Sequence, residues 1–266
     1  RRKSRAHWSD DMRPGFTSSV CPDRTLAELI ATAKKYGYEG LEFRVDWDHK
    51  HGVELSASQD DLAAAQGTLE DSGIEATCIA TGVQLNSTDA AEHKKEQESL
   101  KRHIELAQGV GARYLRVFGD PVPEEEADRD KALSLAAESC VAVDEHAGQH
   151  NAKVLIETHT NMRADWARRI VEDSGATNVG VLWHIGHHVS RGQPVDEAFG
   201  HIQGRIDHLH FNISEGGKVT DADNQRTFDL MKPDGYEGFF SVEVINPDDS
   251  EAVLAHHIKK FKSFNQ

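Results

Sequence analysis

The 266-residue chain carries 45 acidic residues against 30 Lys and Arg, which gives a formal net charge of -15 at pH 7. This charge makes nucleic acid a poor partner, because phosphate binding needs a basic surface that releases counterions. The hydrophobic fraction of 38% is low but sufficient for a buried core, and no apolar run approaches the length that spans a bilayer. The composition therefore predicts a soluble globular protein without nucleic-acid or membrane partners.

The N-terminal segment and the cysteines both bear on localisation. Residues 1–5 are basic, but no apolar stretch follows them, so the segment does not resemble a secretory signal. We interpret residues 1–12 as a flexible tail and residues 13–266 as one domain. Cys21, Cys78 and Cys140 are widely spaced and form no CxxC pair, which is typical of a reduced, cytoplasmic setting.

Short apolar runs alternate with amphipathic stretches along the rest of the chain. The runs expected as strands lie near residues 15–20, 39–45, 74–80, 112–118, 151–159, 179–184, 206–210 and 239–243. The stretches expected as helices begin near residues 26, 58, 91, 130, 162, 194, 224 and 250. Gly37 is placed to end the first helix, and Ser58 is placed to cap the second.

This alternation implies parallel strands that are joined by right-handed crossovers. Eight such units in about 250 residues predict an α/β protein with a single-domain (β/α)8 TIM-barrel fold. A doubly wound open sheet is the main rival, but no glycine-rich fingerprint follows the first expected strand.

Four consecutive expected strands end in residues of the metal-ligand type. They are Glu157, His184, His210 and Glu243. A carboxylate at the end of a buried strand is unfavourable unless something pairs with it, and a barrel brings the carboxyl ends of its strands around one mouth. We expect these side chains to bind one divalent ion, manganese first and otherwise cobalt, zinc or magnesium, since two imidazoles disfavour magnesium.

The expected strands also separate into two faces, because successive strand side chains point in opposite directions. The face suited to pack against helices is apolar: Leu41, Phe43, Val45, Leu115, Val117, Ile156, Trp183, Leu209, Phe211, Val242 and Val244. The face expected to point into the barrel is polar: Glu42, Arg44, Arg116, Glu157, His159, His184, His208, His210, Asn212, Ser241 and Glu243. So many ionisable groups in one lumen require a cation or a polar ligand between them.

At these residues the chain resembles the xylose isomerase-like TIM-barrel superfamily of sugar phosphate isomerases and epimerases. The likeness begins at residues 26–42, ends near residue 245 and so covers nearly the whole chain. Family metal ligands come from strands five to eight as Glu, Asp, His and Glu, and the matching residues are Glu157, His184, His210 and Glu243. His187 matches a family histidine that usually touches a substrate oxygen.

The sequence departs from the family pattern at three positions. His184 stands in place of the family Asp, which makes the site one negative charge poorer and implies either a softer metal or an altered site. Arg163 lies where family ketose epimerases carry a Glu, and Gly216 lies where they carry an Arg. Epimerisation of a free ketose is therefore less favoured than membership of the fold alone would suggest.

The resemblance implies a divalent-metal-dependent sugar isomerase or epimerase that acts on a small keto sugar or related polyol through an enediolate. Glu157 and Glu243 are the expected catalytic pair, which takes a proton from one face of the substrate and returns it from the other. The expected contacts for substrate hydroxyls or an acidic group are His187, Arg44, Arg116, His159 and Lys218. For the two arginines the alternative is ion pairing with Glu42 or Asp120.

Other functions remain open. A metal-dependent lyase or dehydratase would use the same enolate but expel a hydroxyl or glycosidic group from a keto-inositol or 3-keto-glycoside. An apurinic endonuclease would need several zinc ions and a basic DNA face, which the acidic charge disfavours. A non-catalytic sugar-binding barrel would be consistent with His184. Relatives often assemble, so a homo-oligomer is a further possibility by analogy.

Overall fold

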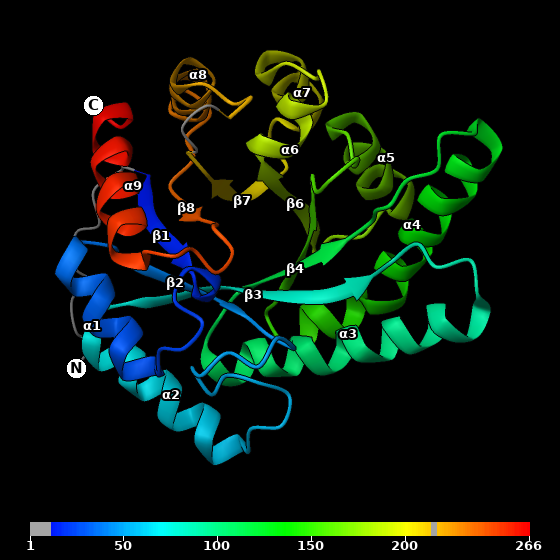
Figure 1. Ribbon diagram of the computed structural model, residues 1–266. Coiled ribbons are helices and arrows are strands. Elements are labelled where there is room, and N and C mark those ends of the chain that lie inside the picture. Colours follow the sequence, from blue (N-terminus) through cyan, green and yellow to red (C-terminus); the bar gives the residue numbers. More distant parts are fainter. Residues whose placement is uncertain (1–11, 214–216) are drawn as a thin grey trace.

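The computed structural model describes residues 12–213 and 217–266. The described residues form eight parallel strands that are hydrogen-bonded in chain order, and β8 pairs with β1, so the sheet closes. The strands are β1 Arg13–Thr17, β2 Gly40–Arg44, β3 Glu75–Gln84, β4 Tyr114–Phe118, β5 Lys153–Glu157, β6 Val179–His184, β7 Ile206–Phe211 and β8 Phe239–Val242. Helices surround this barrel (Figure 1). The expected TIM barrel is confirmed.

The helices of the described residues lie mainly between the strands, as expected. They are α1 Leu26–Tyr36, α2 Gln59–Ser72, α3 Ala90–Val110, α4 Glu126–Gln149, α5 Ala164–Ser174, α6 Ile185–Ser190, α7 Val195–Ile202, α8 Asp221–Met231 and α9 Ser250–Phe264. Helix α6 was not expected, because its six residues are too few to show a helical pattern of apolar side chains. It follows β6 directly and therefore begins at the mouth of the barrel.

The expected helix signals act as the sequence indicates. Gly37 follows α1 with a φ of 84°, a left-handed conformation that glycine adopts without strain. Ser58 caps α2, since its side chain accepts a hydrogen bond from the backbone N–H of Asp61 while the Asp61 carboxylate accepts one from the Ser58 backbone. These caps satisfy backbone groups that the helix itself leaves unpaired.

The first strand is shorter than expected. β1 ends at Thr17, and a 3-10 helix, Ser18–Val20, takes up the rest of the expected run. The Ser18 hydroxyl accepts a hydrogen bond from the backbone N–H of Arg44 at 2.9 Å and lies 2.9 Å from Nδ1 of His49. Local side-chain hydrogen bonds of this kind compete with strand pairing, so the chain turns early.

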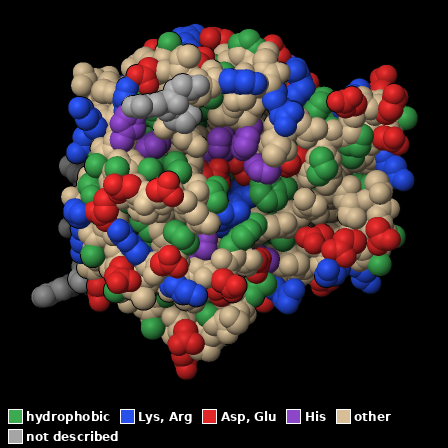
Figure 2. Space-filling model, in the orientation of Figure 1, with side chains coloured by type: hydrophobic (Ala, Val, Ile, Leu, Met, Phe, Trp, Pro, Cys, Tyr) green, Lys and Arg blue, Asp and Glu red, His purple; other side chains and the backbone are tan. Residues whose placement is uncertain are grey.

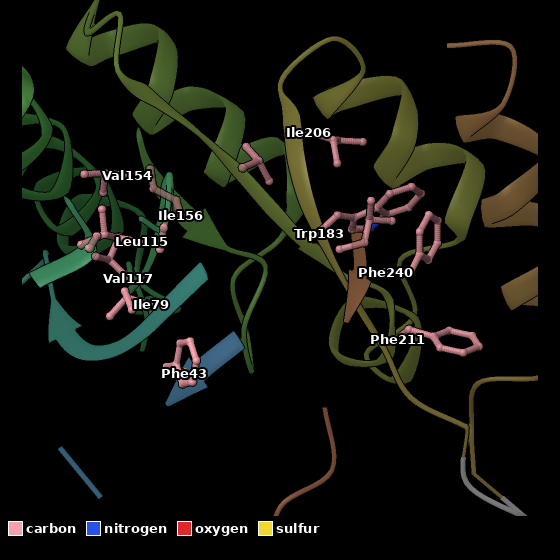
Figure 3. Close-up of a cluster of buried hydrophobic side chains, with 14 of the residues drawn as sticks. Phe43, Ile79, Leu115, Val117, Val154, Ile156, Trp183, Ile206, Phe211 and Phe240 are labelled. Carbon is pink, nitrogen blue, oxygen red and sulfur yellow. The ribbon is translucent and has the colours of Figure 1, made fainter. Parts of the chain in front are cut away.

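The apolar core lies between the strands and the helices (Figure 3). Phe43, Leu115, Ile156 and Trp183 are all 0% exposed, as expected for the helix-facing side of their strands. The Trp183 ring lies 6.0 Å from the ring of Phe199 on α7. Full burial of each such side chain stabilises the fold by about 1.5–3 kcal/mol. The strand parity is thereby confirmed and leaves the polar residues for the inside.

The expected tail, residues 1–12, falls almost entirely on residues 1–11, which lie outside the described residues. Met12 is 3% exposed, and its carbonyl accepts a hydrogen bond from the Asn265 side chain. Within residues 12–213 and 217–266, every helix is too short or too polar to cross a bilayer.

Candidate metal centre

A cavity of about 380 Å³ opens at the carboxyl ends of the strands. The last residues of β2, β4 and β6, which are Arg44, Phe118 and His184, all contribute to its lining. Histidine side chains gather near the centre of the face shown in Figure 2, beside basic and acidic ones. The barrel therefore places its polar strand ends where TIM barrels carry their active sites.

Four side chains in this cavity bring potential ligand atoms together. Glu157 ends β5, His184 ends β6, His187 lies on α6 and Glu243 follows β8 directly. One ligand atom from each lies within 4.8 Å of the others. The structure thus groups three of the four expected ligands with His187, which was expected to contact substrate, rather than with His210.

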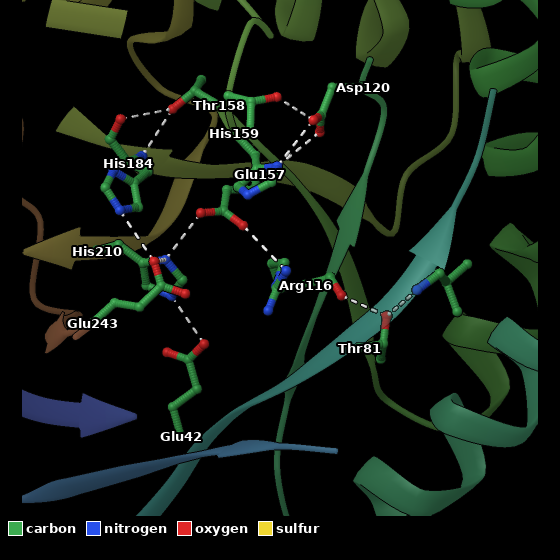
Figure 4. A network of polar contacts seen from close by, with 12 residues as sticks. Glu42, Thr81, Arg116, Asp120, Glu157, Thr158, His159, His184, His210 and Glu243 are labelled. Atoms are coloured by element: carbon green, nitrogen blue, oxygen red, sulfur yellow. Dashed lines mark hydrogen bonds and ion pairs between the residues drawn. The ribbon is translucent and has the colours of Figure 1, made fainter. Parts of the chain in front are cut away.

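The donor set fits a divalent cation. Nδ1 of His184 and Oε2 of Glu157 are buried and have no hydrogen-bond partner among the described residues. Buried polar atoms are normally satisfied, and two carboxylates with two imidazoles match the preferences of manganese, cobalt or zinc. The backbone N–H of His184 donates to Thr158 Oγ1 at 2.8 Å, which fixes the end of β6 beside β5 (Figure 4).

His210 lies beside this group and connects it to a second buried cluster (Figure 4). Its Nδ1 is 3.1 Å from Oε1 of Glu157 and 3.3 Å from Oε2 of Glu243. Its Nε2 is 2.9 Å from Oε1 of Glu42, whose other oxygen lies 2.9 Å from Nε2 of His208. Glu42 and both histidines are 0% exposed. Glu42 therefore fixes the orientation of the His210 ring.

The charges of the carboxylates depend on these neighbours. Burial is the largest influence on Glu157 and Glu243 and would raise the pKa of each. At Glu157 the attraction of Arg116 and His210 outweighs the effect of burial. At Glu243 the attraction of His210 and His184 does so. The pKa of each carboxyl group is therefore lowered. Both groups are therefore ionised at neutral pH, as metal ligands and proton acceptors must be.

The pKa values of His210 and His187 shift in opposite directions. Burial would lower the pKa of His210, but the nearby Glu243, Glu42 and Glu157 raise it well above its ordinary value. Burial and then repulsion from His184 lower the pKa of His187 to about 3. His187 is therefore neutral at pH 7 and can donate or accept a hydrogen bond.

The residues expected to contact substrate all line the same cavity. They are His187, Arg44, Arg116, His159 and Lys218. His159 has Nδ1 2.9 Å from Oδ2 of Asp120, and its ring lies 4.8 Å from that of His187. Lys218, beyond β7, donates to the backbone carbonyl of Ser190 at 3.1 Å.

The alternative ion pairs considered for the arginines do not form. Glu42 pairs with His208 and His210 instead of Arg44. Asp120 accepts hydrogen bonds from His159 and Thr160, whereas Arg116 has a guanidinium nitrogen 3.4 Å from Oε2 of Glu157. Glu42 was expected to face the lumen, with ion pairing to an arginine as the alternative. Its role as a partner of two histidines escaped sequence reasoning, because β2 and β7 are far apart in the chain.

A third group of possible ligands lies outside the cavity, on the surface formed by α3 and α4. It consists of Glu105, His146 and His150. Nε2 of His146 is 3.3 Å from Oε1 of Glu105, and these two side chains are 24% and 51% exposed. This group has no contact with the barrel mouth, but it matters when bound metal is measured.

Comparison with known proteins shows similarity over the whole barrel. The chain is similar to a 3-keto-D-glucoside 4-epimerase from E. coli, with 14% identity and a TM-score of 0.74 over 95% of this chain and 98% of that one. It is also similar to an L-ribulose 3-epimerase, with 19% identity and a TM-score of 0.77 over 96% of this chain and 94% of that one. The IolI protein with a zinc atom bound is 18% identical, with a TM-score of 0.75 over 95% of this chain and 96% of that one. At such identities the likeness shows the fold alone.

Among curated proteins, none matches the sequence. A family model described as xylose isomerase-like TIM barrel, in contrast, matches residues 30–264, which is most of the chain. The match includes every strand except β1 and all the ligand-type residues of the mouth. The chain therefore belongs to the xylose isomerase-like TIM-barrel family.

Proposed function

We propose that the chain is a divalent-metal-dependent isomerase or epimerase of a small keto sugar or related polyol. The observation that carries this proposal is the convergence of Glu157, His184, His187 and Glu243, whose ligand atoms lie within 4.8 Å of one another. The buried Nδ1 of His184 supports it further, because this atom has no hydrogen-bond partner among the described residues and buried polar atoms are normally satisfied.

Glu157, His184, Glu243 and His210 are the proposed ligands of one divalent ion. His210 is preferred to His187 as the fourth ligand for two reasons. Its Nδ1 already lies within 3.3 Å of both carboxylates, and the contact between its Nε2 and Glu42 leaves Nδ1 as the coordinating atom. His187 then remains available to bind a substrate hydroxyl. Manganese is the first candidate, followed by cobalt and zinc.

The chemistry follows from the two carboxylates. A divalent ion in this site would polarise a keto group and so acidify the neighbouring C–H bond. Glu157 is ionised and can accept that proton, which leaves an enediolate. Glu243 comes from beyond β8, three strands away from β5, and therefore reaches the cavity from a different side. We propose that Glu243 takes up a proton from solvent water and delivers it to the other face of the enediolate, while Glu157 releases its proton to solvent.

A lyase that expels a β-hydroxyl or glycosidic group is the second candidate. It would share the first proton transfer and differ only in needing an acid for the leaving group. The observation that favours it is the pair formed by His159 and Asp120, with Nδ1 and Oδ2 2.9 Å apart at the edge of the same cavity. Imidazole groups commonly act as general acids, and the contact with Asp120 orients the His159 ring at this edge of the cavity.

The test is proton exchange in heavy water. Protein loaded with Mn²⁺ is incubated with D-fructose, D-ribulose and a 3-keto-glucoside, and deuterium next to the carbonyl is followed by NMR. We expect exchange with at least one of these sugars and loss of exchange in Glu157→Gln. A new absorbing enone from the 3-keto-glucoside would assign elimination, whereas an epimeric sugar would assign epimerisation.

The same experiment can contradict the assignment of an enzymatic function. If the sugars bind, as shown by a raised melting temperature, but none of them incorporates deuterium from the heavy water, the enzyme assignment is wrong. The chain would then be a non-catalytic sugar-binding barrel.

A further inference from the structure

Arg44 presents to the cavity a guanidinium group that has no ion pair among the residues the structure describes. It is the last residue of β2 and lines the cavity at the barrel mouth. Its Nε is buried, and within the described residues this atom has no hydrogen-bond partner. The Trp47 ring lies 3.9 Å from the guanidinium carbon and stacks against it. This contact holds the group in place, and within the described residues no carboxylate forms a hydrogen bond or ion pair with it.

Arg116 provides a second cation in the same cavity. Its side chain is 2% exposed, with a guanidinium nitrogen 3.4 Å from Oε2 of Glu157 and the Phe118 ring 4.1 Å from the guanidinium carbon. Burial and then repulsion from Arg116 lower the pKa of Arg44, and these influences exceed the attraction of Glu243 and Glu157. Two guanidinium groups thus line one cavity and repel each other.

Lys218 adds a third cation to the lining. Its ammonium group donates to the Ser190 carbonyl, and no described carboxylate pairs with it. Glu243, which lines the cavity, and the fully buried Glu157 are the carboxylates proposed to hold a metal ion. This local excess of positive charge lies in a chain whose formal net charge is -15, so it cannot be attributed to a generally basic surface.

An unpaired guanidinium in a partly buried site is unfavourable unless a ligand pairs with it. The planar group binds carboxylate and phosphate oxygens through two parallel hydrogen bonds. We propose that the substrate of this cavity is an acidic sugar, whose carboxylate or phosphate binds Arg44 with support from Arg116 and Lys218. This inference rests on the proposed function and narrows its substrate class.

The proposal separates this chain from the structures that it resembles. Their names refer to uncharged sugars: a 3-keto-D-glucoside, L-ribulose and D-psicose. An uncharged sugar would leave the guanidinium of Arg44 without a counter-ion, whereas an acidic sugar would supply one. At about 380 Å³ the cavity lies at the small end of small-molecule sites, which suits a single sugar unit.

The test is calorimetric titration with D-fructose, D-gluconate and D-fructose 6-phosphate at one low salt concentration, with metal-free and Mn²⁺-loaded protein. We expect at least one of the two acidic ligands to bind about tenfold more tightly than D-fructose, since a charge-assisted bidentate contact is added. Preference for D-gluconate assigns a carboxylate, and preference for the sugar phosphate assigns a phosphate.

Three variants make this test specific. Arg44→Gln should weaken the acidic ligand far more than D-fructose and so remove the preference, and Lys218→Gln, at an exposed position, should reduce the preference. Arg113→Gln is the matched control, because it removes the same charge from the cavity at the opposite end of the barrel. Arg44→Lys keeps the charge and should retain part of the preference. Melting temperatures show whether each variant is folded.

Two outcomes would overturn the inference. One is equal affinity of the wild-type protein for D-fructose and both acidic ligands. The other is a preference that survives in both Arg44→Gln and Lys218→Gln. These failures differ from failure of the proposed function. If Mn²⁺ does not bind but the metal-free protein prefers the acidic ligand, the metal assignment is wrong and the anion site stands.

Discussion

The two ends of the barrel each carry a polar cavity, but they use their charges differently. At the N-terminal end a cavity of about 450 Å³ is bounded by Arg13, Glu75 and Asp207. Two ion pairs lie at this end: Arg13 is 2.5 Å from Glu75, and Lys153 is 2.6 Å from Asp207. At the C-terminal end the cavity is smaller, yet among the described residues Nε of Arg44 and Nδ1 of His184 are buried there without a hydrogen-bond partner.

The difference shows that volume alone does not locate a functional site. Within the described residues, no group of possible metal ligands lines the N-terminal cavity, whereas one group lies at the mouth and a second, Glu42, His208 and His210, is buried beside it. Ion pairs that are complete within the chain have no need of a ligand. Buried polar groups that lack a partner within the chain favour ligand binding, because the ligand supplies the missing hydrogen bond or ion pair. The following predictions test this contrast, from the largest expected effect to the smallest.

The largest effect is expected for Glu157→Gln. The variant removes the proposed proton acceptor and one metal ligand, so the rate of proton exchange should fall by about 10²- to 10⁴-fold. Glu75→Gln, which makes the same change at the N-terminal end, should leave the rate within about twofold of the wild-type value. The rate of proton exchange of each variant is measured by NMR and compared with that of the wild-type protein. Similar losses in both variants would contradict the contrast between the ends.

A buried histidine with complete hydrogen bonds should affect stability and not function. His257 is 2% exposed, its Nδ1 donates to the Val253 carbonyl, and its Nε2 accepts from the backbone N–H of Ile213. Burial lowers its pKa to about 4. The unfolded chain therefore binds the proton more readily, so stability is full above about pH 6.5 and falls as the pH drops towards 4.

His257 alone should reduce the free energy of unfolding by about 3 kcal/mol over this pH window. Urea denaturation at several pH values measures the effect. His257→Gln keeps an acceptor for Ile213 but cannot be protonated, so its stability should depend less on pH. An unchanged pH dependence in this variant would show that His257 is not buried in its neutral form.

Glu42→Gln should weaken metal binding without removing a ligand. Glu42 orients His210 through a contact of 2.9 Å between Oε1 and Nε2. Loss of such a supporting carboxylate typically lowers metal affinity about 10- to 100-fold. Titration with Mn²⁺ measures the affinity, and Glu42→Asp should recover part of it. If both variants bind Mn²⁺ as well as the wild-type protein, Glu42 has no role in positioning His210.

The smallest effect is expected at the N-terminal end. Asp207→Asn removes the partner of Lys153, and the two side chains are only 19% and 25% exposed. Burial raises the pKa of Asp207 against the attraction of Lys153, so the pair contributes little net stability. We expect a loss of about 1 kcal/mol or less in urea denaturation and no change in Mn²⁺ affinity. A large fall in affinity would mean that the two ends are coupled.

The sequence predicts the fold well because each strand and helix carries its own pattern. Alternating apolar and polar residues identify the strands, and the parity of residues such as Phe43 and Glu42 assigns one side to the helices and the other to the lumen. Strand ends then predict the position of Glu157, His184 and Glu243. Two local features escape this reasoning: helix α6, which is too short to show a period, and the early end of β1, which depends on Ser18 bonding to β2.

The partners of each side chain are harder to predict than its direction. Arg116 pairs with Glu157 and not with Asp120, although either pairing agrees with the strand parity. His210 contacts Glu42, a residue 168 positions away in the sequence. Such choices depend on distances of a few ångströms across the barrel, which no pattern along a single strand encodes.

The most direct test of the central claim is the metal content of the purified protein by mass spectrometry. The surface group of Glu105, His146 and His150 could bind a second ion, so His146→Ala is introduced into every sample. We expect one equivalent of manganese, cobalt or zinc in this protein and almost none after the further change Glu243→Gln.

Glu237→Gln, at the N-terminal end, is the matched control and should retain the ion. The account would be contradicted if the His146→Ala protein held no ion, or if Glu243→Gln held as much as the control. Metal that appears only when His184→Asp is added would show that this barrel has lost its metal site through that single residue.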